Sequence, residues 1–298
     1  MGFPLRYIEP VYRPPSEARS LILPLTDGCS WNRCAFCEMY TAPQKRFRAR
    51  DAAEVLAGIQ ALGAAAGAAD IRRIFLADGD ALVLPTRRLL EVLLAIRAHL
   101  PAVRRVSCYG LPRNVRKKSV AELRELAAAG LSLVYVGAES GDDEVLTRID
   151  KGETFASTLE ALEKLGAAGI RRSVMILNGL GGEILSAAHA QHSAELMNAA
   201  QPEYLATLVL SFPQGEARFR AAFPEWTPRS ISGLLEEMAR FIERLELKRT
   251  VFRSDHASNW LSLRGNLPED KARLLEQLRL ALAHPETAPL RPAWARGL

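Results

Sequence analysis

The sequence predicts an α/β protein whose main part is a partial (βα)6 TIM-like barrel, followed by a C-terminal, mostly helical extension. Short apolar runs rich in β-branched residues alternate with longer amphipathic segments along most of the chain. Glycine and polar residues follow the ends of these apolar runs. Such alternation is typical of parallel strands joined by helices in right-handed crossovers, and the chemistry of these folds gathers at the carboxyl ends of the strands.

Six strands, each followed by a helix, are expected in order along the chain. The strands are predicted at 20–25, 72–77, 103–109, 131–138, 170–177 and 203–210. Helices are predicted at about 52–67, 86–99 and 119–129 after the first three strands, at 142–149 and 154–168 after the fourth, and at 186–199 after the fifth. Beyond residue 211 the alternation breaks, and we expect helices at roughly 215–222, 228–246 and 268–283 with a strand at 249–254.

This pattern divides the chain into three parts. Residues 1–19, which include Pro14 and Pro15, are predicted to be an extended N-terminal lead-in. Residues 20–210 form the predicted barrel. Residues 211–298 form the C-terminal extension, which we interpret as a candidate substrate lid.

Composition and charge indicate which class of partner the protein binds. Charged residues make up 24% of the 298 residues, and the net charge is +5. Because the basic residues are scattered, a small-molecule substrate is favoured over a nucleic acid. No stretch of 18 apolar residues is present, and residues 1–20 lack the apolar centre of a secretory signal. We therefore expect a cytoplasmic protein without membrane contact, in which clustered thiols indicate metal or redox chemistry.

Three of the four cysteines lie within nine residues, directly after the first predicted strand. Cys29, Cys34 and Cys37 have the spacing C-x4-C-x2-C. Three thiolates can hold three irons of a [4Fe–4S] cluster and leave the fourth iron open to another molecule. A zinc site would need a fourth ligand, for which Cys108 is the remaining cysteine. The other interpretation of Cys108 is a small buried hydrophobe on its strand.

This loop resembles that of the radical S-adenosylmethionine (radical SAM) superfamily. Members of that superfamily carry C-x3-C-x2-C after the first strand of a partial barrel, with an aromatic residue before the last cysteine, which is Phe36 here. The present spacing has one extra residue between the first two cysteines. The chain is loosely similar to relatives of oxygen-independent coproporphyrinogen oxidase. The resemblance covers about residues 20–210 and implies a [4Fe–4S] cluster and SAM as cofactors.

The loops after the second and third strands resemble SAM-binding segments. Asp78, Gly79 and Asp80 stand where the superfamily has a Gly-Gly-Glu loop that binds the methionine amino group, and Asp80 would take the glutamate position. Taken alone, the same residues are also typical of an ordinary Asp-Gly turn. After the third strand, Arg113 is expected to pair with the SAM carboxylate or a substrate acid, with a surface arginine as the alternative.

The next two loops continue the resemblance in the family order. Glu139 and Ser140 match a GxES segment that supplies polar contacts to SAM, although Ser140 or Asp142 can also cap the following helix. Asn178, Gly179 and Gly181 are similar to the glycine-rich segment whose backbone binds adenine. A glycine-rich turn between a strand and a helix is weak evidence alone, because many folds that bind phosphate have one.

Four further residues are candidates for substrate contact. Tyr109 ends the third strand, and Arg253, His256 and Asn259 are crowded around the end of the last predicted strand in a polar, aromatic segment. Such a cluster is typical of a lid or a substrate loop. For His256 the alternative is a histidine that only completes a turn.

The resemblance implies reductive cleavage of SAM to methionine and a 5′-deoxyadenosyl radical, which abstracts a hydrogen atom from a substrate of unknown identity. It also implies an electron donor such as flavodoxin or ferredoxin. Two alternatives stay open. One is SAM-dependent methyl or alkyl transfer on the same barrel, and the other is a non-enzymatic, zinc-stabilised RNA-binding protein.

Overall fold

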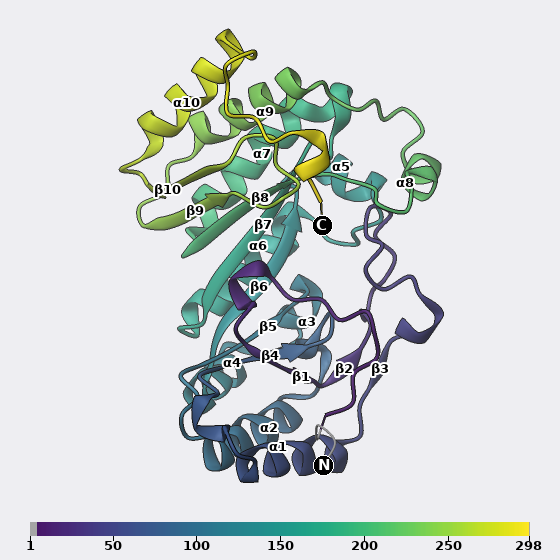
Figure 1. Ribbon diagram of the computed structural model, residues 1–298, viewed down its shortest axis with the longest axis vertical. Helices are drawn as coiled ribbons and strands as arrows, with labels where there is room; N and C mark the ends of the chain where they lie inside the picture. The colour runs from purple at the N-terminus through teal and green to yellow at the C-terminus, as the bar shows by residue number, and fades with distance from the viewer. Residues whose placement is uncertain (1–4, 298) are drawn as a thin grey trace. The chain divides into compact units, whose positions relative to one another are not determined.

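The computed structural model describes residues 5–297 and contains a mostly parallel eight-stranded sheet within that range (Figure 1). The strands follow the order β1-β4-β5-β6-β7-β8-β9-β10, and β10 pairs antiparallel with β9. In the described residues, β1 and β10 are the edges of this sheet, so it does not close into a full barrel. The predicted α/β class is confirmed. Residues 1–4 of the predicted lead-in and Leu298 of the predicted extension lie outside the described residues.

The chain forms two compact units, of which the first consists of Met1–Asn32, Cys37–Val136 and Glu163–Arg172. Its strands are β1 (Leu21–Pro24), β4 (Arg73–Ala77), β5 (Arg105–Tyr109) and most of β6 (Leu131–Glu139). Its helices are α1 (Ala52–Ala64), α2 (Thr86–His99), α3 (Pro112–Arg116) and α4 (Val120–Ala129). The strands pair in parallel, while α1 packs against α2 and α2 against α4.

The second unit consists of Arg33–Phe36, Gly137–Leu162 and Ser173–Leu298. Its strands are β7 (Arg171–Asn178, from Ser173 on), β8 (Tyr204–Val209), β9 (Thr250–Ser254) and β10 (Leu263–Leu267). Its helices are α5 (Asp143–Arg148), most of α6 (Phe155–Ala167), α7 (Gly182–Ala200), α8 (Ala217–Ala222), α9 (Ile231–Arg244) and α10 (Lys271–Ala283). Helix α7 packs against α9, and α9 packs against α10 (Figure 1).

Local sequence explains where several helices begin. Asp51 accepts a hydrogen bond from the Glu54 backbone N–H and caps α1. Ser119 and Glu122 form a reciprocal capping box at the start of α4. Ser230 caps α9 in the same manner by accepting from the Gly233 backbone N–H. These caps satisfy N–H groups that the first helical turn leaves without a partner.

Some predicted bounds are wrong, for physical reasons. Helix α10 begins at Lys271 and not at Pro268, because Asn266 to Asp270 form a turn that ends β10. Strand β10 was not predicted, although Leu263, Gly265 and Leu267 are buried and alternate with exposed residues. The glycine in the middle of this short segment obscured the strand pattern. None of the helices in the described residues is long and apolar enough to cross a membrane.

Candidate active site

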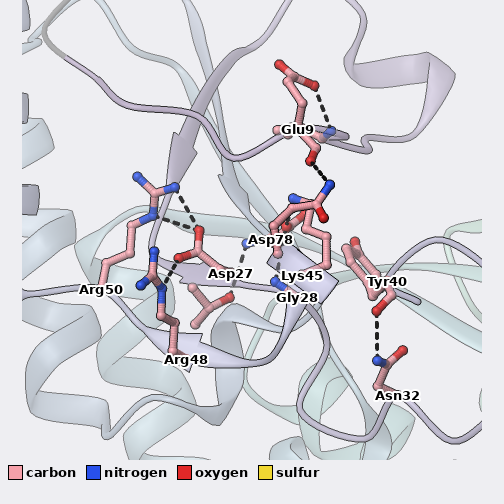
Figure 2. A network of polar contacts seen from close by, with 12 residues as sticks. Glu9, Asp27, Gly28, Asn32, Tyr40, Lys45, Arg48, Arg50 and Asp78 are labelled. Carbon is pink, nitrogen blue, oxygen red and sulfur yellow. Dashed lines mark hydrogen bonds and ion pairs between the residues drawn. The ribbon is translucent and has the colours of Figure 1, made fainter. Parts of the chain in front are cut away.

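The three clustered cysteines lie on one loop, residues 28–47, which we call the cysteine loop. Its two ends are joined by a two-stranded antiparallel ladder of β2 (Thr26–Asp27) and β3 (Arg48–Ala49). The buried Asp27 carboxylate accepts from Arg48 Nε at 2.6 Å and from Arg50 Nη2 at 2.7 Å (Figure 2). These arginines lower the pKa of Asp27 against the opposing effect of burial. Two residues per strand are too few for a sequence pattern, so sequence analysis missed this ladder.

The thiols themselves suit a metal cluster in type and exposure. Cys29, Cys34 and Cys37 are half-buried, and none of the four cysteines forms a disulfide. Cys108 is completely buried on β5, and burial raises the pKa of its thiol. This confirms Cys108 as a small buried hydrophobe and makes it a poor source of the thiolate that zinc requires. Among residues 5–297, no three His, Cys, Asp or Glu side chains are gathered into a preformed metal site.

The loop after β4 is fastened directly to the cysteine loop. Asp78 Oδ2 accepts from the backbone N–H of Gly28 at 3.2 Å and from Lys45 Nζ at 2.5 Å, and Figure 2 shows both donors directed at this carboxylate. The Asp78 backbone N–H donates to Thr26 Oγ1 at 3.1 Å. Burial raises the pKa of Asp78, and the neighbouring Lys45 opposes that rise. Lys45 is a central residue here that sequence analysis did not single out.

Gly79 lies in close contact with the first cysteine. A Cβ on this glycine would stand 2.7 Å from Tyr40 Cε2 and 3.1 Å from Cys29 Cβ, so a side chain has no room there. The Gly79 backbone N–H donates to the Gly28 carbonyl at 3.1 Å. Burial raises the pKa of Tyr40 well above its usual value, and the nearby groups of Asp78, Cys29 and Cys37 raise it further. The Asp78–Gly79 turn and Tyr40 therefore form a close-fitting support for Cys29.

Asp80 is fully buried, and both of its carboxylate oxygens accept hydrogen bonds from the protein. Ser30 Oγ and Asn114 Nδ2 each donate to Oδ2 at 2.5 Å, and the Leu111 backbone N–H lies 3.5 Å from Oδ1. Burial raises the pKa of Asp80 to about 6 in spite of these donors. Asp80 thus joins the cysteine loop to the start of α3. A role for Asp80 in binding the SAM amino group stays a prediction.

Arg113 and Tyr109 were both predicted at the end of β5, and they lie in aromatic surroundings. The Arg113 guanidinium carbon is 3.6 Å from the centroid of the Trp31 ring, which belongs to the cysteine loop. Tyr109 makes edge-on contacts with Phe75 at 5.0 Å and with Tyr135 at 6.2 Å between ring centroids. Burial raises the pKa of the Tyr109 hydroxyl, so this phenol stays protonated at neutral pH.

In the second unit, Phe36 and Glu139 meet through a lysine that sequence analysis missed. Lys151 Nζ is 2.9 Å from Glu139 Oε1 and 5.8 Å from the centroid of the Phe36 ring. Glu139 has a positive φ of 66°, and its Oε2 is buried without a hydrogen-bond partner in the described structure. An unpaired buried carboxylate oxygen at a strand end is a ready acceptor for a ligand hydroxyl or ammonium group.

Ser140 belongs to a buried polar chain. Its hydroxyl lies 2.8 Å from His189 Nδ1, and His189 Nε2 lies 3.8 Å from Glu237 Oε1. The Asp142 backbone N–H also donates to Ser140 Oγ, at 3.0 Å, and Asp142 itself caps α5. Of the two caps that the sequence offered, Ser140 and Asp142, the structure shows Asp142.

The glycine-rich segment after β7 is tightly held by neighbours. Gly179 has a φ of 87°, donates its N–H to Glu237 Oε1 at 2.6 Å and accepts from Trp226 Nε1 at 3.2 Å. Asn178 Nδ2 donates to the Leu234 carbonyl at 3.2 Å. A Cβ on Gly181 would stand 2.9 Å from the Leu185 backbone. The adenine-binding role of these residues is untested and stays a prediction.

The three substrate candidates at the end of β9 and in the segment after it differ in their surroundings. Arg253 is exposed and donates to the carbonyls of Phe252 and Gly265. His256 Nδ1 accepts from the Ser258 backbone N–H at 3.1 Å. Asn259 is buried, donates to the Thr207 carbonyl at 2.9 Å, and has an Oδ1 without a partner in the described structure. Asn178 and Asn259 both line one small cavity, so a predicted SAM residue and a predicted substrate residue face the same space.

Comparison with known protein families found a match that covers the cysteine loop. The family model of the Radical SAM superfamily matches residues 23–190, which is more than half of the 298 residues. This stretch contains the cysteine loop and every predicted SAM segment. No curated protein sequence matches the chain.

Several solved structures share the fold. Coproporphyrinogen III oxidase (HemN) from Escherichia coli has a TM-score of 0.55 at 14% identity, with 76% of this chain and 52% of that chain covered. The radical SAM methyltransferase TsrM from Kitasatospora setae, solved with cobalamin and a [4Fe–4S] cluster, has a TM-score of 0.52 at 22% identity, covering 64% of this chain and 36% of that one. The cobalamin-dependent radical SAM enzyme OxsB, solved with aqua-cobalamin and SAM, has a TM-score of 0.51 at 16% identity, covering 75% and 31%. The chain thus spans about a third of the length of the cobalamin-dependent proteins and half of the oxidase, and these likenesses concern the fold.

Proposed function

The chain belongs to the radical SAM superfamily, and from this premise we propose that Cys29, Cys34 and Cys37 hold three irons of a [4Fe–4S] cluster. Members of the superfamily are enzymes whose cofactors are this cluster and SAM, and these are the cofactors of this chain. The observation that carries the assignment is the set of three half-buried thiols within nine residues of one anchored loop, while Cys108 is sequestered in the core. Soft thiolate donors are those that iron–sulfur clusters take.

Held by Cys29, Cys34 and Cys37, the cluster would supply the electron for reductive cleavage of SAM to methionine and a 5′-deoxyadenosyl radical, the chemistry that would allow hydrogen abstraction from a substrate. The residues of this chain bind and orient the groups. We assign Glu139 Oε2 as an acceptor for SAM, because it is buried without a protein partner. Lys151 neutralises part of the Glu139 charge and holds its other oxygen, so Oε2 keeps a defined direction.

The remaining SAM contacts follow the superfamily order of the loops. We assign them to Phe36 and Arg113, to the turns after β4 and β6, and to the segment after β7. The turn after β4 contributes Asp78, Gly79 and Asp80, and the turn after β6 contributes Glu139 and Ser140. The segment after β7 contributes Asn178, Gly179 and Gly181. Asp80 accepts protein hydrogen bonds at both oxygens, whereas Asp78 Oδ1 is buried without a hydrogen-bond partner in the described structure. Within the turn after β4, Asp78 Oδ1 and the main chain are therefore the better acceptors for the SAM amino group.

For the substrate we propose a small molecule in a cytoplasmic reaction, with flavodoxin or ferredoxin as the electron donor. Tyr109, Arg253, His256 and Asn259 are the proposed substrate residues. The exposed Arg253 guanidinium donates to the carbonyls of Phe252 and Gly265 and is suited to an anionic group. Residues 211–298 remain the proposed lid.

The test uses anaerobically reconstituted protein. We expect broad absorption near ~400 nm from thiolate-ligated iron in the wild type, and 5′-deoxyadenosine after addition of SAM and dithionite. Replacing Cys29, Cys34 or Cys37 by serine removes both signals, whereas Cys108→Ala is the matched control and keeps them. A colourless protein with one bound zinc contradicts the proposal. S-adenosylhomocysteine as the main product would instead indicate methyl transfer.

A further inference from the structure

Lys45 is the most deeply buried charged side chain of the cysteine loop, with a side-chain exposure of 1%. Its ammonium group is 2.5 Å from Asp78 Oδ2, and the Asp78 side chain is 3% exposed. A buried lysine is stable as a cation only beside a compensating charge. Asp78 supplies that charge, and Figure 2 shows the pair in the middle of the loop's polar network.

The pair connects the two ends of the cysteine loop. Gly28, which immediately precedes Cys29, and Lys45, eight residues after Cys37, both donate to the same oxygen of Asp78. The main chain at these two residues is also in close contact, because a Cβ on Gly28 would lie 2.0 Å from the Lys45 carbonyl oxygen. Gly28 has a φ of 72°, so only glycine suits both the space and the backbone.

The Lys45–Asp78 pair is also connected to Cys29, through Gly79. Gly79 follows Asp78 and lies against Cys29 Cβ and Tyr40, with its N–H bonded to the Gly28 carbonyl. A shift of Asp78 therefore displaces Gly28, Gly79 and Cys29 together. The main chain at Gly28 and Gly79 has little room to move in response, because neighbouring atoms already fill the space beside both glycines.

We propose that Lys45 is a positioning residue for the iron–sulfur cluster, acting through Asp78. The ammonium group neutralises Asp78 and so fixes the position of Cys29, and its charge contributes to the electrostatic field at the thiolates. This inference rests on the proposed function, because it takes the three cysteines as cluster ligands. Outer-shell groups of this kind orient metal ligands and set the properties of the bound metal.

The test compares Lys45→Met, Lys45→Arg, Asp78→Asn and the double variant Lys45→Met/Asp78→Asn, with Lys248→Met as the control for loss of an exposed lysine. Each protein is reconstituted anaerobically. Three quantities are measured: iron per chain, the rate of iron loss to a chelator, and the midpoint potential from an EPR-monitored redox titration. Circular dichroism reports whether each variant is folded.

Removal of one charge leaves the other uncompensated, so the two single variants should move the midpoint potential in opposite directions. Lys45→Met makes it more negative and Asp78→Asn makes it more positive, because a negative charge nearby disfavours the reduced cluster. Both lose iron about ten-fold faster than the wild type, the lower end of the effect of outer-shell partners on metal affinity. Lys45→Arg keeps the charge and restores most of the iron retention.

A folded Lys45→Met protein with the potential and iron-loss rate of the wild type overturns the inference. If the single variants do not fold, the double variant decides, since it leaves no buried charge without a partner. Iron loss faster than the wild type supports the inference, and loss at the wild-type rate overturns it. A wild-type protein that binds no cluster overturns the proposed function itself, which separates the two failures.

Discussion

The hydroxyl of Ser140 and Nδ1 of His189 lie 2.8 Å apart, and both side chains are fully buried although the residues are 49 positions apart. Ser140 is the first residue after β6, and His189 lies in the middle of α7. On its far side, His189 faces Glu237 of α9, which also accepts from Gly179 and from Ser186. One histidine thus links the turn after β6 to the polar network that supports the turn after β7.

This relationship predicts a stability defect for His189→Ala. The change leaves Ser140 and Glu237 without the imidazole and opens space in a buried polar chain, so we expect the free energy of unfolding to fall by about 2–3 kcal/mol. Urea denaturation measures the loss. His284→Ala, which removes an exposed histidine, is the control and should change stability little. Equal effects from the two substitutions would contradict a structural role for the Ser140–His189 contact.

Gly79→Ala should reduce cluster loading more than it reduces stability. The added Cβ would meet Tyr40 Cε2 at 2.7 Å and Cys29 Cβ at 3.1 Å, so Tyr40 or the first cysteine must move. We expect iron per chain to drop at least two-fold after anaerobic reconstitution, in line with the sensitivity of metal binding to its outer shell. Gly297→Ala is the control, because its Cβ would meet nothing within 4 Å. Full iron loading in Gly79→Ala would show that the close contact of Gly79 with Tyr40 and Cys29 is not required for cluster binding.

His256 predicts a stability change on the acid side of neutrality. Burial lowers the pKa of this imidazole below its usual 6.5, and the neighbouring Arg291 lowers it further. The ring accepts from the Ser258 N–H at Nδ1, so the folded state favours the neutral form. As the pH falls below about 6.5, the unfolded chain binds a proton that the folded chain resists, and stability decreases until the folded pKa is passed.

Denaturation at pH 7.5 and at pH 5.5 measures this change in the wild type and in His256→Gln. We expect the wild type to lose more stability between these pH values than the variant, because glutamine does not titrate. The same pH dependence in both proteins would assign the acid sensitivity to other groups.

The C-terminal tail should restrain the segment that carries the substrate candidates. Arg296 stacks on Trp260 with its guanidinium carbon 3.9 Å from the ring centroid, and it donates to the Ser258 carbonyl through Nε and Nη2. Arg296→Gln removes a cation–π contact of about 1 kcal/mol and two hydrogen bonds. Amide hydrogen exchange in residues 255–260 should therefore become roughly five- to ten-fold faster. Arg240→Gln, at an exposed arginine of α9, is the control. Unchanged exchange in Arg296→Gln would show that the tail does not hold this segment.

Much of the fold could be predicted because its signals are local. Seven of the strands from β1 to β9 are longer than two residues, and the period of the apolar residues predicted the bounds of each to within a few positions. Helix α2 has the predicted bounds of 86–99. The three-cysteine spacing and the order of the loops identified the superfamily, since both lie along the chain. Strands β2, β3 and β10 were missed because two-residue strands and a strand with a central glycine carry no clear alternation.

The sequence by itself determined the strand–helix order, the cysteine loop and its place after the first strand. Only the tertiary structure decided which polar residues are bound within the protein. Lys45 meets Asp78 across 33 residues and Glu237 meets Gly179 across 58, and nothing in the neighbouring letters marks these partners. A buried charge or hydrogen bond depends on distances that the fold creates, whereas a strand or a metal-binding spacing depends on residues close together in the chain.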